Sequence, residues 1–127
     1  MAIYLLDTSI IIDAINDKKT RNLGLLGLAG QGHTLACCPI NVAEVYAGLR
    51  PKEEPRTAAL LRSLLLYPIT FPIAELAGRL KRDYSRKGKT LSIPDTIVAA
   101  VALHHQLTLI TDNAKDFPME HLAFHSL

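Results

Sequence analysis

The amino-acid sequence predicts an α/β fold with a central parallel sheet of four to five strands and helices on both of its faces. Short apolar runs alternate along the chain with longer segments of helical periodicity, a pattern typical of parallel sheets. Two of these runs, Ile3–Leu6 and Leu107–Ile110, lack alternating polar residues, as expected for strands buried on both faces. The length of 127 residues favours one domain, so we expect residues 1–127 to form a single unit.

Capping and turn residues indicate the elements of the first half of the chain. Thr8–Ser9 can cap the first helix, and the turn Gly30–Gln31–Gly32 can end the second. Pro39 suits the first turn of the third helix. The elements expected here are a strand at Ile3–Leu6, helices at Ile10–Asn16 and Arg21–Ala29, a strand at Thr34–Cys38, and a helix from Pro39 that ends before Pro51–Pro55.

The second half of the chain is expected to alternate between helices and strands in the same way. Gly88–Leu91 is expected to be a loop, and the helix after it is strongly apolar. The elements expected here are helices at Ala58–Leu66, Pro72–Arg86 and Pro94–His105, and strands at Tyr67–Phe71, Leu107–Ile110 and Leu122–His125.

The composition argues against several classes of protein. A hydrophobic fraction of 49% and a charged fraction of 20% indicate a globular chain. No apolar run approaches the roughly 18–20 residues of a membrane span, and the N-terminus lacks the basic region of a signal peptide. A bridge between the neighbours Cys37 and Cys38 would be strained, so both are expected to be buried reduced thiols. We therefore expect a cytoplasmic protein.

One segment of the chain is strongly basic. Between Arg79 and Lys89 the sequence has six basic residues and one acid, Asp83, for a local charge of +5. Such a segment can bind phosphates of RNA, or it can be the solvated face of a helix. The candidate RNA-binding residues are Arg79, Lys81, Arg82, Arg86, Lys87 and Lys89.

Acidic residues recur where the predicted elements begin or end. Asp7 ends the first apolar run, and Asp112 comes two residues after the run that ends at Ile110. Ligands of open parallel sheets bind beyond the carboxyl ends of the strands, and several carboxylates drawn together there suit a hard divalent cation. The residues expected to face this end of the sheet are Asp7, Glu44, Asp95 and the cluster Asp112–Asn113–Asp116.

Each of these acids also has a purely structural interpretation. Asp7 can cap a helix, Asp95 can complete a capping box that begins at Ser92, and Glu44 can be a surface glutamate. Asp112 or its neighbour Asn113 can cap a short turn. Four independent caps would not need this order, these strand ends and apolar residues on both sides, so the sequence favours a shared site.

The chain resembles a PIN domain, and most closely a VapC-type toxin ribonuclease. The matching stretches are Tyr4–Ser9, Val42–Val45, Ile93–Ala99 and Leu109–Phe117. Each stretch alone is weakly specific, whereas their order, spacing and total length agree with the family over essentially the whole chain.

The resemblance implies a PIN-like single domain whose acids bind Mg²⁺ or Mn²⁺. It implies a toxin of a toxin–antitoxin pair that cleaves single-stranded RNA by means of a metal-activated water. The partners expected on this basis are the RNA substrate and a small cognate antitoxin protein. The family also implies a homodimer, formed by apolar faces of the helices at Arg21–Ala29 and Ala58–Leu66, and a toxin–antitoxin hetero-oligomer.

The resemblance also implies roles for single residues. Asp7 and Asp95 match the most regular metal ligands of the family, and Glu44 matches its helix-borne acid. Thr8 and Thr111 match hydroxyl positions beside the site that orient a carboxylate or a water. Metal binding is therefore expected at Asp7 and Asp95, with the remaining acids as further catalytic residues.

The resemblance leaves the fourth catalytic position open among three residues. Many relatives carry an acid or an amide where Asn113 stands, and Asp112 and Asp116 are neighbouring alternatives. If Asn113 fills that position, the site carries one negative charge fewer. This motivates an alternative function, a catalytically weak PIN-like module that binds RNA or protein. A phosphotransferase with Asp7 as nucleophile is disfavoured, because the residue two positions later is Ser9 and not an aspartate.

Overall fold

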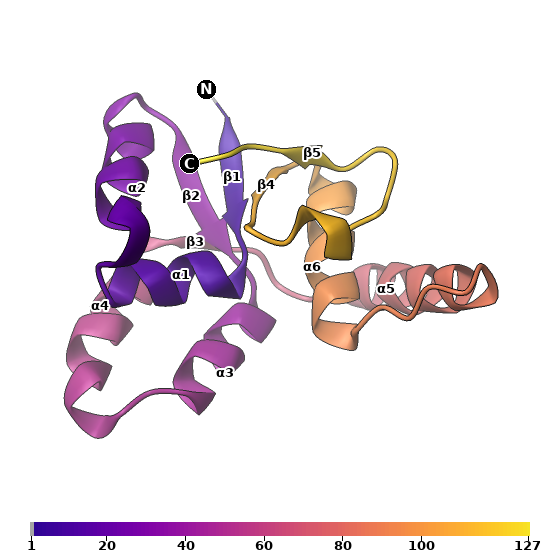
Figure 1. Ribbon diagram of the computed structural model, residues 1–127, viewed down its shortest axis with the longest axis horizontal. Coiled ribbons are helices and arrows are strands. Elements are labelled where there is room, and N and C mark those ends of the chain that lie inside the picture. Colours follow the sequence, from indigo (N-terminus) through magenta and orange to yellow (C-terminus); the bar gives the residue numbers. More distant parts are fainter. Residues whose placement is uncertain (1) are drawn as a thin grey trace.

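A five-stranded parallel sheet forms the centre of the protein, as the sequence predicts (Figure 1). The computed structural model describes residues 2–127, apart from the side chain of Lys19. The strands lie in the order β3-β2-β1-β4-β5, so the first strand of the chain is the middle of the sheet. Their bounds are β1 Ile3–Leu6, β2 Thr34–Cys37, β3 Leu65–Leu66, β4 Thr108–Ile110 and β5 Ala123–Phe124.

Helices cover both faces of this sheet, and two separate hydrophobic clusters mark the two faces. Buried residues of α1, α2, α3 and α4 form one cluster, and those of α5 and α6 form the other. Figure 1 shows α1, α2 and α4 on one side of the strands and α5 and α6 on the other. The helices span Thr8–Ile15 (α1), Arg21–Gly30 (α2), Pro39–Ala47 (α3), Glu54–Ser63 (α4), Phe71–Arg86 (α5) and Ile93–His105 (α6).

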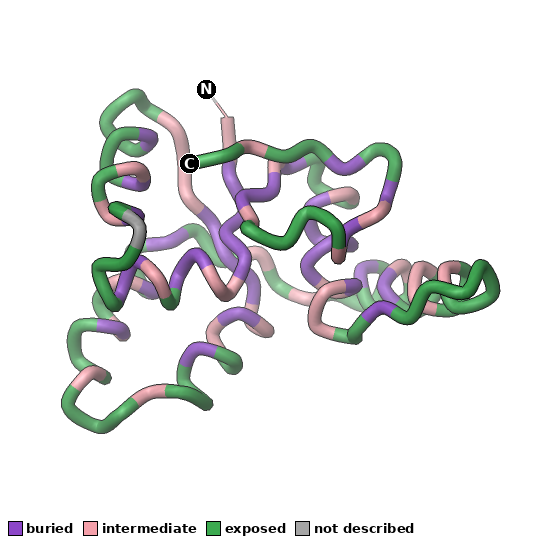
Figure 2. Tube along the Cα trace, viewed as in Figure 1, coloured by how far each residue is buried: buried purple, intermediate pink, exposed green. Residues whose placement is uncertain are grey.

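The alternation of side chains along β1 explains why its sequence is apolar throughout. Leu5 packs into the cluster of α5 and α6, whereas Tyr4 and Leu6 pack into the cluster on the opposite face. Successive side chains of a strand point to opposite faces, so a strand between two layers of helices must be apolar at every position. The buried trace in the middle of Figure 2 follows these central strands.

The third strand is where the sequence-based prediction is wrong. The predicted helix Ala58–Leu66 ends at Ser63 as α4. In place of the predicted strand Tyr67–Phe71, residues 67–70 form a loop, and Phe71 is the first residue of α5. The observed strand, Leu65–Leu66, pairs with Ala36 and Cys37 of β2. Its side chains are half exposed at the sheet edge, so the apolar residues there resembled a continuing helix, while Pro68 cannot donate to a ladder.

The remaining predicted elements are confirmed within a few residues at each end. Asp7, and not Thr8–Ser9, caps α1, since its carboxylate accepts a hydrogen bond from the Thr8 N–H. Three short 3₁₀ segments that the sequence did not indicate lie at Lys18–Thr20 (η1), Pro51–Glu53 (η2) and Ala114–Asp116 (η3). Among residues 2–127, no helix has the length and apolar character required to cross a membrane.

We predict that Leu5→Ala lowers the free energy of unfolding by roughly 3 kcal/mol, because it opens a cavity in the middle strand, where Leu5 is 0% exposed. Urea unfolding measures this loss. The matched control is Leu23→Ala in α2, where the side chain is 71% exposed and the expected loss is below about 0.5 kcal/mol. Equal losses in the two variants would contradict the layered core.

Candidate active site

The candidate site begins where the two middle strands end. Asp7 directly follows β1, and its backbone N–H donates to the carbonyl of Ile110, the last residue of β4, at 3.0 Å. Thr111 directly follows β4. Neighbouring parallel strands therefore place Asp7 and Thr111 together at the carboxyl end of the sheet, where open α/β sheets bind their ligands.

Asp7 is a buried carboxylate with two donors. One of its oxygens accepts from the Thr8 N–H at 2.9 Å, and the other accepts from the Thr111 hydroxyl at 2.7 Å. Its exposure is only 8%. Burial raises the pKa of Asp7 above its ordinary value, and the charges of Glu44 and Asp116 raise it further, although both hydrogen bonds act in the opposite direction. The helix cap and the acid of the site are thus one residue.

Glu44 reaches the same place from α3. The Thr8 hydroxyl donates to one carboxylate oxygen of Glu44 at 2.7 Å, and Thr8 in turn accepts from the side-chain amide of Asn41 at 3.0 Å. Glu44 itself is exposed, whereas Asn41 is fully buried. Asn41 was not identified from the sequence. It is a polar residue in the otherwise apolar start of α3, three positions before Glu44, and this pattern could have indicated a residue of the site.

Asp95 approaches the site from the opposite layer of helices. It lies in the first turn of α6, where its backbone N–H donates to the Ser92 hydroxyl at 3.2 Å. Because α6 leads into the beginning of β4, the start of α6 lies at the carboxyl end of the sheet. Burial raises the pKa of Asp95, a hydrogen bond from Ser92 lowers it, and the charges of Asp7, Asp116 and Glu44 raise it again.

Asp7, Glu44, Asp95 and Asp116 therefore form what we call the acidic cluster. The charges of Glu44 and Asp116 act on both Asp7 and Asp95, so the four carboxylates share one region although they come from four different segments. Carboxylates gathered in this way repel one another unless a proton or a cation reduces the charge. The cluster is thus a region of negative potential that favours a bound cation.

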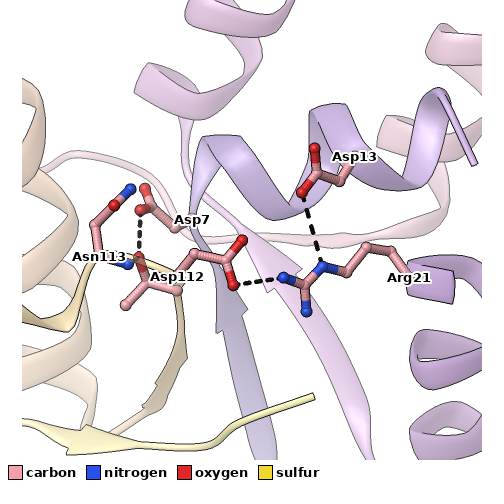
Figure 3. A network of polar contacts seen from close by, with 6 residues as sticks. Asp7, Asp13, Arg21, Asp112 and Asn113 are labelled. Carbon is pink, nitrogen blue, oxygen red and sulfur yellow. Dashed lines mark hydrogen bonds and ion pairs between the residues drawn. The ribbon is translucent and has the colours of Figure 1, made fainter. Parts of the chain in front are cut away.

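Asp112 has a different environment from the acidic cluster. Its carboxylate pairs with the guanidinium of Arg21, whose Nε also lies 3.8 Å from Asp13. Arg21 is only 6% exposed, whereas the Asp112 side chain is 33% exposed, so the ion pair lies between the buried guanidinium and the solvent. Figure 3 shows the Asp112 side chain pointing toward Arg21 and away from Asp7.

Asn113 and Asp116 occupy the turn that follows Thr111. The Asn113 backbone N–H donates to the Thr111 hydroxyl at 3.1 Å, and the Asp116 N–H donates to the Asn113 carbonyl at 2.8 Å. Thr111 thus accepts from the turn and donates to Asp7. Of the three open candidates, Asp116 is the one whose charge acts on Asp7 and Asp95, and Asp112 is the partner of Arg21.

The basic residues of α5 and the following loop are only partly available to a ligand. Arg79 pairs with Glu75 at 3.6 Å and Arg82 with Asp83 at 3.3 Å. The ammonium groups of Lys81 and Lys89 donate to the carbonyls of Leu91 and Lys115, and Lys87 lies over the Tyr84 ring. The contact at Lys115, 3.1 Å long, brings Lys89 beside η3, the turn that carries Asp116.

The donor set of the acidic cluster suits Mg²⁺ or Mn²⁺. All of its candidate ligand atoms are carboxylate oxygens, which hard divalent ions prefer. Within residues 2–127 no group of three or more His, Cys, Asp or Glu side chains is placed so that it could hold a metal ion. Mg²⁺ does not require three such ligands, since it keeps several waters and is usually held by one or two carboxylates together with substrate phosphate.

Comparison with known proteins identifies the family. The profile of the PIN domain matches residues 4–123. The chain belongs to the PIN domain family. This PIN domain is 29% identical over 115 residues to Ribonuclease VapC19 of Mycobacterium tuberculosis, which covers 91% of this chain and 92% of that protein. The predicted resemblance to VapC-type ribonucleases is thereby confirmed.

Solved structures share the same fold. The crystal structure of VapBC2 from Rickettsia felis, bound to a DNA fragment from its promoter, matches with a TM-score of 0.86 and 25% identity, and the match covers 98% of each chain. A toxin–antitoxin complex from Klebsiella pneumoniae matches with a TM-score of 0.76 and 30% identity over 94% of this chain and 95% of that one. The predicted α/β fold of PIN type is confirmed.

We predict that Asp7→Asn raises the free energy of unfolding of the metal-free protein at pH 7. Because the pKa of Asp7 is raised in the folded state, the fold retains the proton at pH values where the unfolded chain has lost it. The wild type therefore loses stability as pH rises from the unfolded pKa of about 4 through the folded pKa, and the variant lacks this loss.

Urea unfolding in EDTA at several pH values measures the effect. Glu120→Gln, which removes an exposed acid from the turn before β5, is the matched control and should leave the pH profile of the wild type unchanged. An Asp7→Asn variant that is less stable than the wild type at pH 7 would show that hydrogen bonding to the carboxylate outweighs its burial.

Proposed function

We propose that this PIN domain is a metal-dependent endoribonuclease that cleaves single-stranded RNA and serves as the toxin of a toxin–antitoxin pair. The observation that carries the proposal is the acidic cluster, four carboxylates from four segments near the carboxyl end of the sheet, in which the charges of Glu44 and Asp116 raise the pKa of both Asp7 and Asp95. The relatives named Ribonuclease VapC support RNA as the substrate.

Asp7 and Asp95 are the residues that would hold Mg²⁺ or Mn²⁺. Asp7 is buried, and its carboxylate is held by the Thr8 N–H and the Thr111 hydroxyl before any ligand arrives. Asp95 is half-buried in the first turn of α6, where its own backbone N–H donates to the Ser92 hydroxyl. When bound, the ion supplies charge for the scissile phosphate and lowers the pKa of an attacking water. The exposed Glu44 has one oxygen fixed by Thr8, which leaves the other to accept hydrogen bonds at the rim of the site.

We assign the fourth catalytic position to Asp116 in preference to Asp112 and Asn113. The charge of Asp116 raises the pKa of both Asp7 and Asp95, whereas the carboxylate of Asp112 is paired with Arg21. In this assignment Asp112 holds the turn after β4 in place, and that turn positions Thr111 against Asp7.

We propose that the basic segment binds RNA, and Lys89 is the residue whose contacts support this role most. Its contact with the Lys115 carbonyl places it beside the turn of Asp116, where a phosphate bound by the acidic cluster through a metal would lie. The other candidates, Arg79, Lys81, Arg82, Arg86 and Lys87, would extend this surface along α5.

A small antitoxin is the protein partner that the structural relatives suggest. The matching structure from Klebsiella pneumoniae is a toxin–antitoxin complex, and the one from Rickettsia felis is VapBC2 bound to promoter DNA. The proposal extends a toxin–antitoxin assembly to this chain. A homodimer is proposed on the predicted faces of α2 and α4, where Leu23 and Leu26 of α2 and Leu65 of the adjoining β3 expose apolar side chains beside an apolar hollow.

The alternative function is a catalytically weak module that binds RNA or protein. It is favoured by Asn113, an amide that lies in the turn beside the acidic cluster. It requires that the four acids are insufficient for turnover, and this distinguishes it from the nuclease experimentally.

We predict that the purified protein, free of any partner, cleaves a mixed single-stranded RNA pool with Mg²⁺ or Mn²⁺ and not with EDTA. Asp95→Asn should fold normally and lose at least about 100-fold in cleavage rate, because it removes a metal ligand. Gel analysis and sequencing of the RNA ends measure both. Tight RNA binding by a folded protein without metal-dependent cuts would favour the binding module instead.

We further predict opposite effects for two acids that are four residues apart. Asp116→Asn should reduce cleavage by about 100-fold and leave the urea midpoint nearly unchanged. Asp112→Asn should retain cleavage and lose about 1–2 kcal/mol of unfolding free energy, because it removes the charged partner closest to the buried Arg21 guanidinium. If Asp112→Asn is inactive and stable, the assignment of the fourth position is reversed.

A further inference from the structure

We propose that Asn41 is a positioning residue of the acidic cluster, which holds Glu44 in place through the hydroxyl of Thr8. This inference rests on the proposed function and adds to it a residue that is not itself an acid of the site. Asn41 lies in the first turn of α3 and is 0% exposed. A buried amide is expected to be hydrogen-bonded, so its partners indicate what it does.

The contacts of Asn41 fix which way its amide faces. The side-chain oxygen accepts from the Cys38 backbone N–H at 2.9 Å and from the Cys38 thiol at 3.2 Å. A backbone N–H can only donate, so the atom that faces it must be the amide oxygen. The amide nitrogen of Asn41 is therefore the atom that faces the Thr8 hydroxyl, at 3.0 Å.

The direction of the Asn41 amide sets the direction of the Thr8 hydroxyl. A hydroxyl has a single proton and accepts through its lone pairs, and the amide nitrogen of Asn41 can only donate to it. The Thr8 proton is thus left for Glu44, whose carboxylate oxygen lies 2.7 Å away. The three hydrogen bonds therefore run in one direction: Cys38 donates to Asn41, Asn41 donates to Thr8, and Thr8 donates to the Glu44 carboxylate.

This series of hydrogen bonds matters because the Glu44 side chain is exposed. A long exposed glutamate samples several rotamers, and binding a cation would require that it be ordered first. The Thr8 hydroxyl holds one carboxylate oxygen of Glu44, so the second oxygen can face a ligand. Hydrogen-bonding partners behind a metal ligand commonly change metal affinity by about 10–100-fold when they are removed.

The affinity for Mn²⁺, measured from the electron paramagnetic resonance of the free ion, tests this role in the whole chain. Asn41→Ala and Thr8→Val should each weaken Mn²⁺ binding by about 10-fold. The double variant should bind no more weakly than Thr8→Val alone, because Asn41 acts through Thr8. Thr8→Ser keeps the hydroxyl and should bind like the wild type.

Val45→Ala is the matched control, since Val45 is buried in the same helix, is 2% exposed and makes no side-chain hydrogen bond. It should loosen α3 and keep the Mn²⁺ affinity. Wild-type affinity in Asn41→Ala, additive losses in the double variant, or an equal loss in Val45→Ala would each overturn the role of Asn41. A folded wild type that neither binds Mn²⁺ nor cleaves RNA would overturn the proposed function itself.

Asn41→Ala also removes the acceptor of the Cys38 N–H, so the variant can fail to fold. In that case the Asn41 side-chain amide is observed directly by NMR in the Thr8 variants. One proton of this amide should exchange slowly with solvent in the wild type and in Thr8→Ser. In Thr8→Val its chemical shift should change and its exchange should be faster, in parallel with the loss of Mn²⁺ affinity. An amide that does not respond to Thr8→Val would overturn the inference.

Discussion

The burial of one carboxylate at the end of the middle strand is the constraint on which this end of the molecule depends. A buried carboxylate is costly unless it is hydrogen-bonded, and Asp7 has the Thr8 N–H and the Thr111 hydroxyl as donors. These two contacts fix the start of α1 and the exit of β4. The Asp7 backbone N–H also donates to the Ile110 carbonyl and so extends the pairing of β1 with β4. The Asp7 side chain therefore reaches its position only when these two strands are paired.

The two-layered core explains why acids from distant segments reach the same region. Both faces of the sheet are covered, so polar groups that must meet a ligand are confined to the ends of the strands. α1 and α3 start at the carboxyl end of the sheet because they follow β1 and β2, and α6 starts there because it leads back to β4. Asp7, Glu44 and Asp95 therefore lie at the same end of the sheet without any long loop.

Much of this arrangement could be predicted from the sequence, because it depends on residue type and order. Apolar runs indicated the central strands, and the order of acids along the chain indicated which of them would lie at the carboxyl end of the sheet. The edge strand β3 could not be placed, since its two leucines lie partly in solvent and carry neither the alternation nor the burial of a strand. The separate environments of Asp112 and Asp116 were equally hidden, because they depend on Arg21, which is 91 residues from Asp112 in the chain.

The neighbouring thiols at the end of β2 offer a way to measure local unfolding in this protein. Cys37 and Cys38 are both fully buried, and burial raises the pKa of the Cys38 thiol to about 11. A thiol in this state does not react with disulfide reagents or maleimides while the native packing is closed. Its labelling rate therefore reports how often the junction of β2 and α3 opens, which gives the native chain a built-in chemical probe of local unfolding.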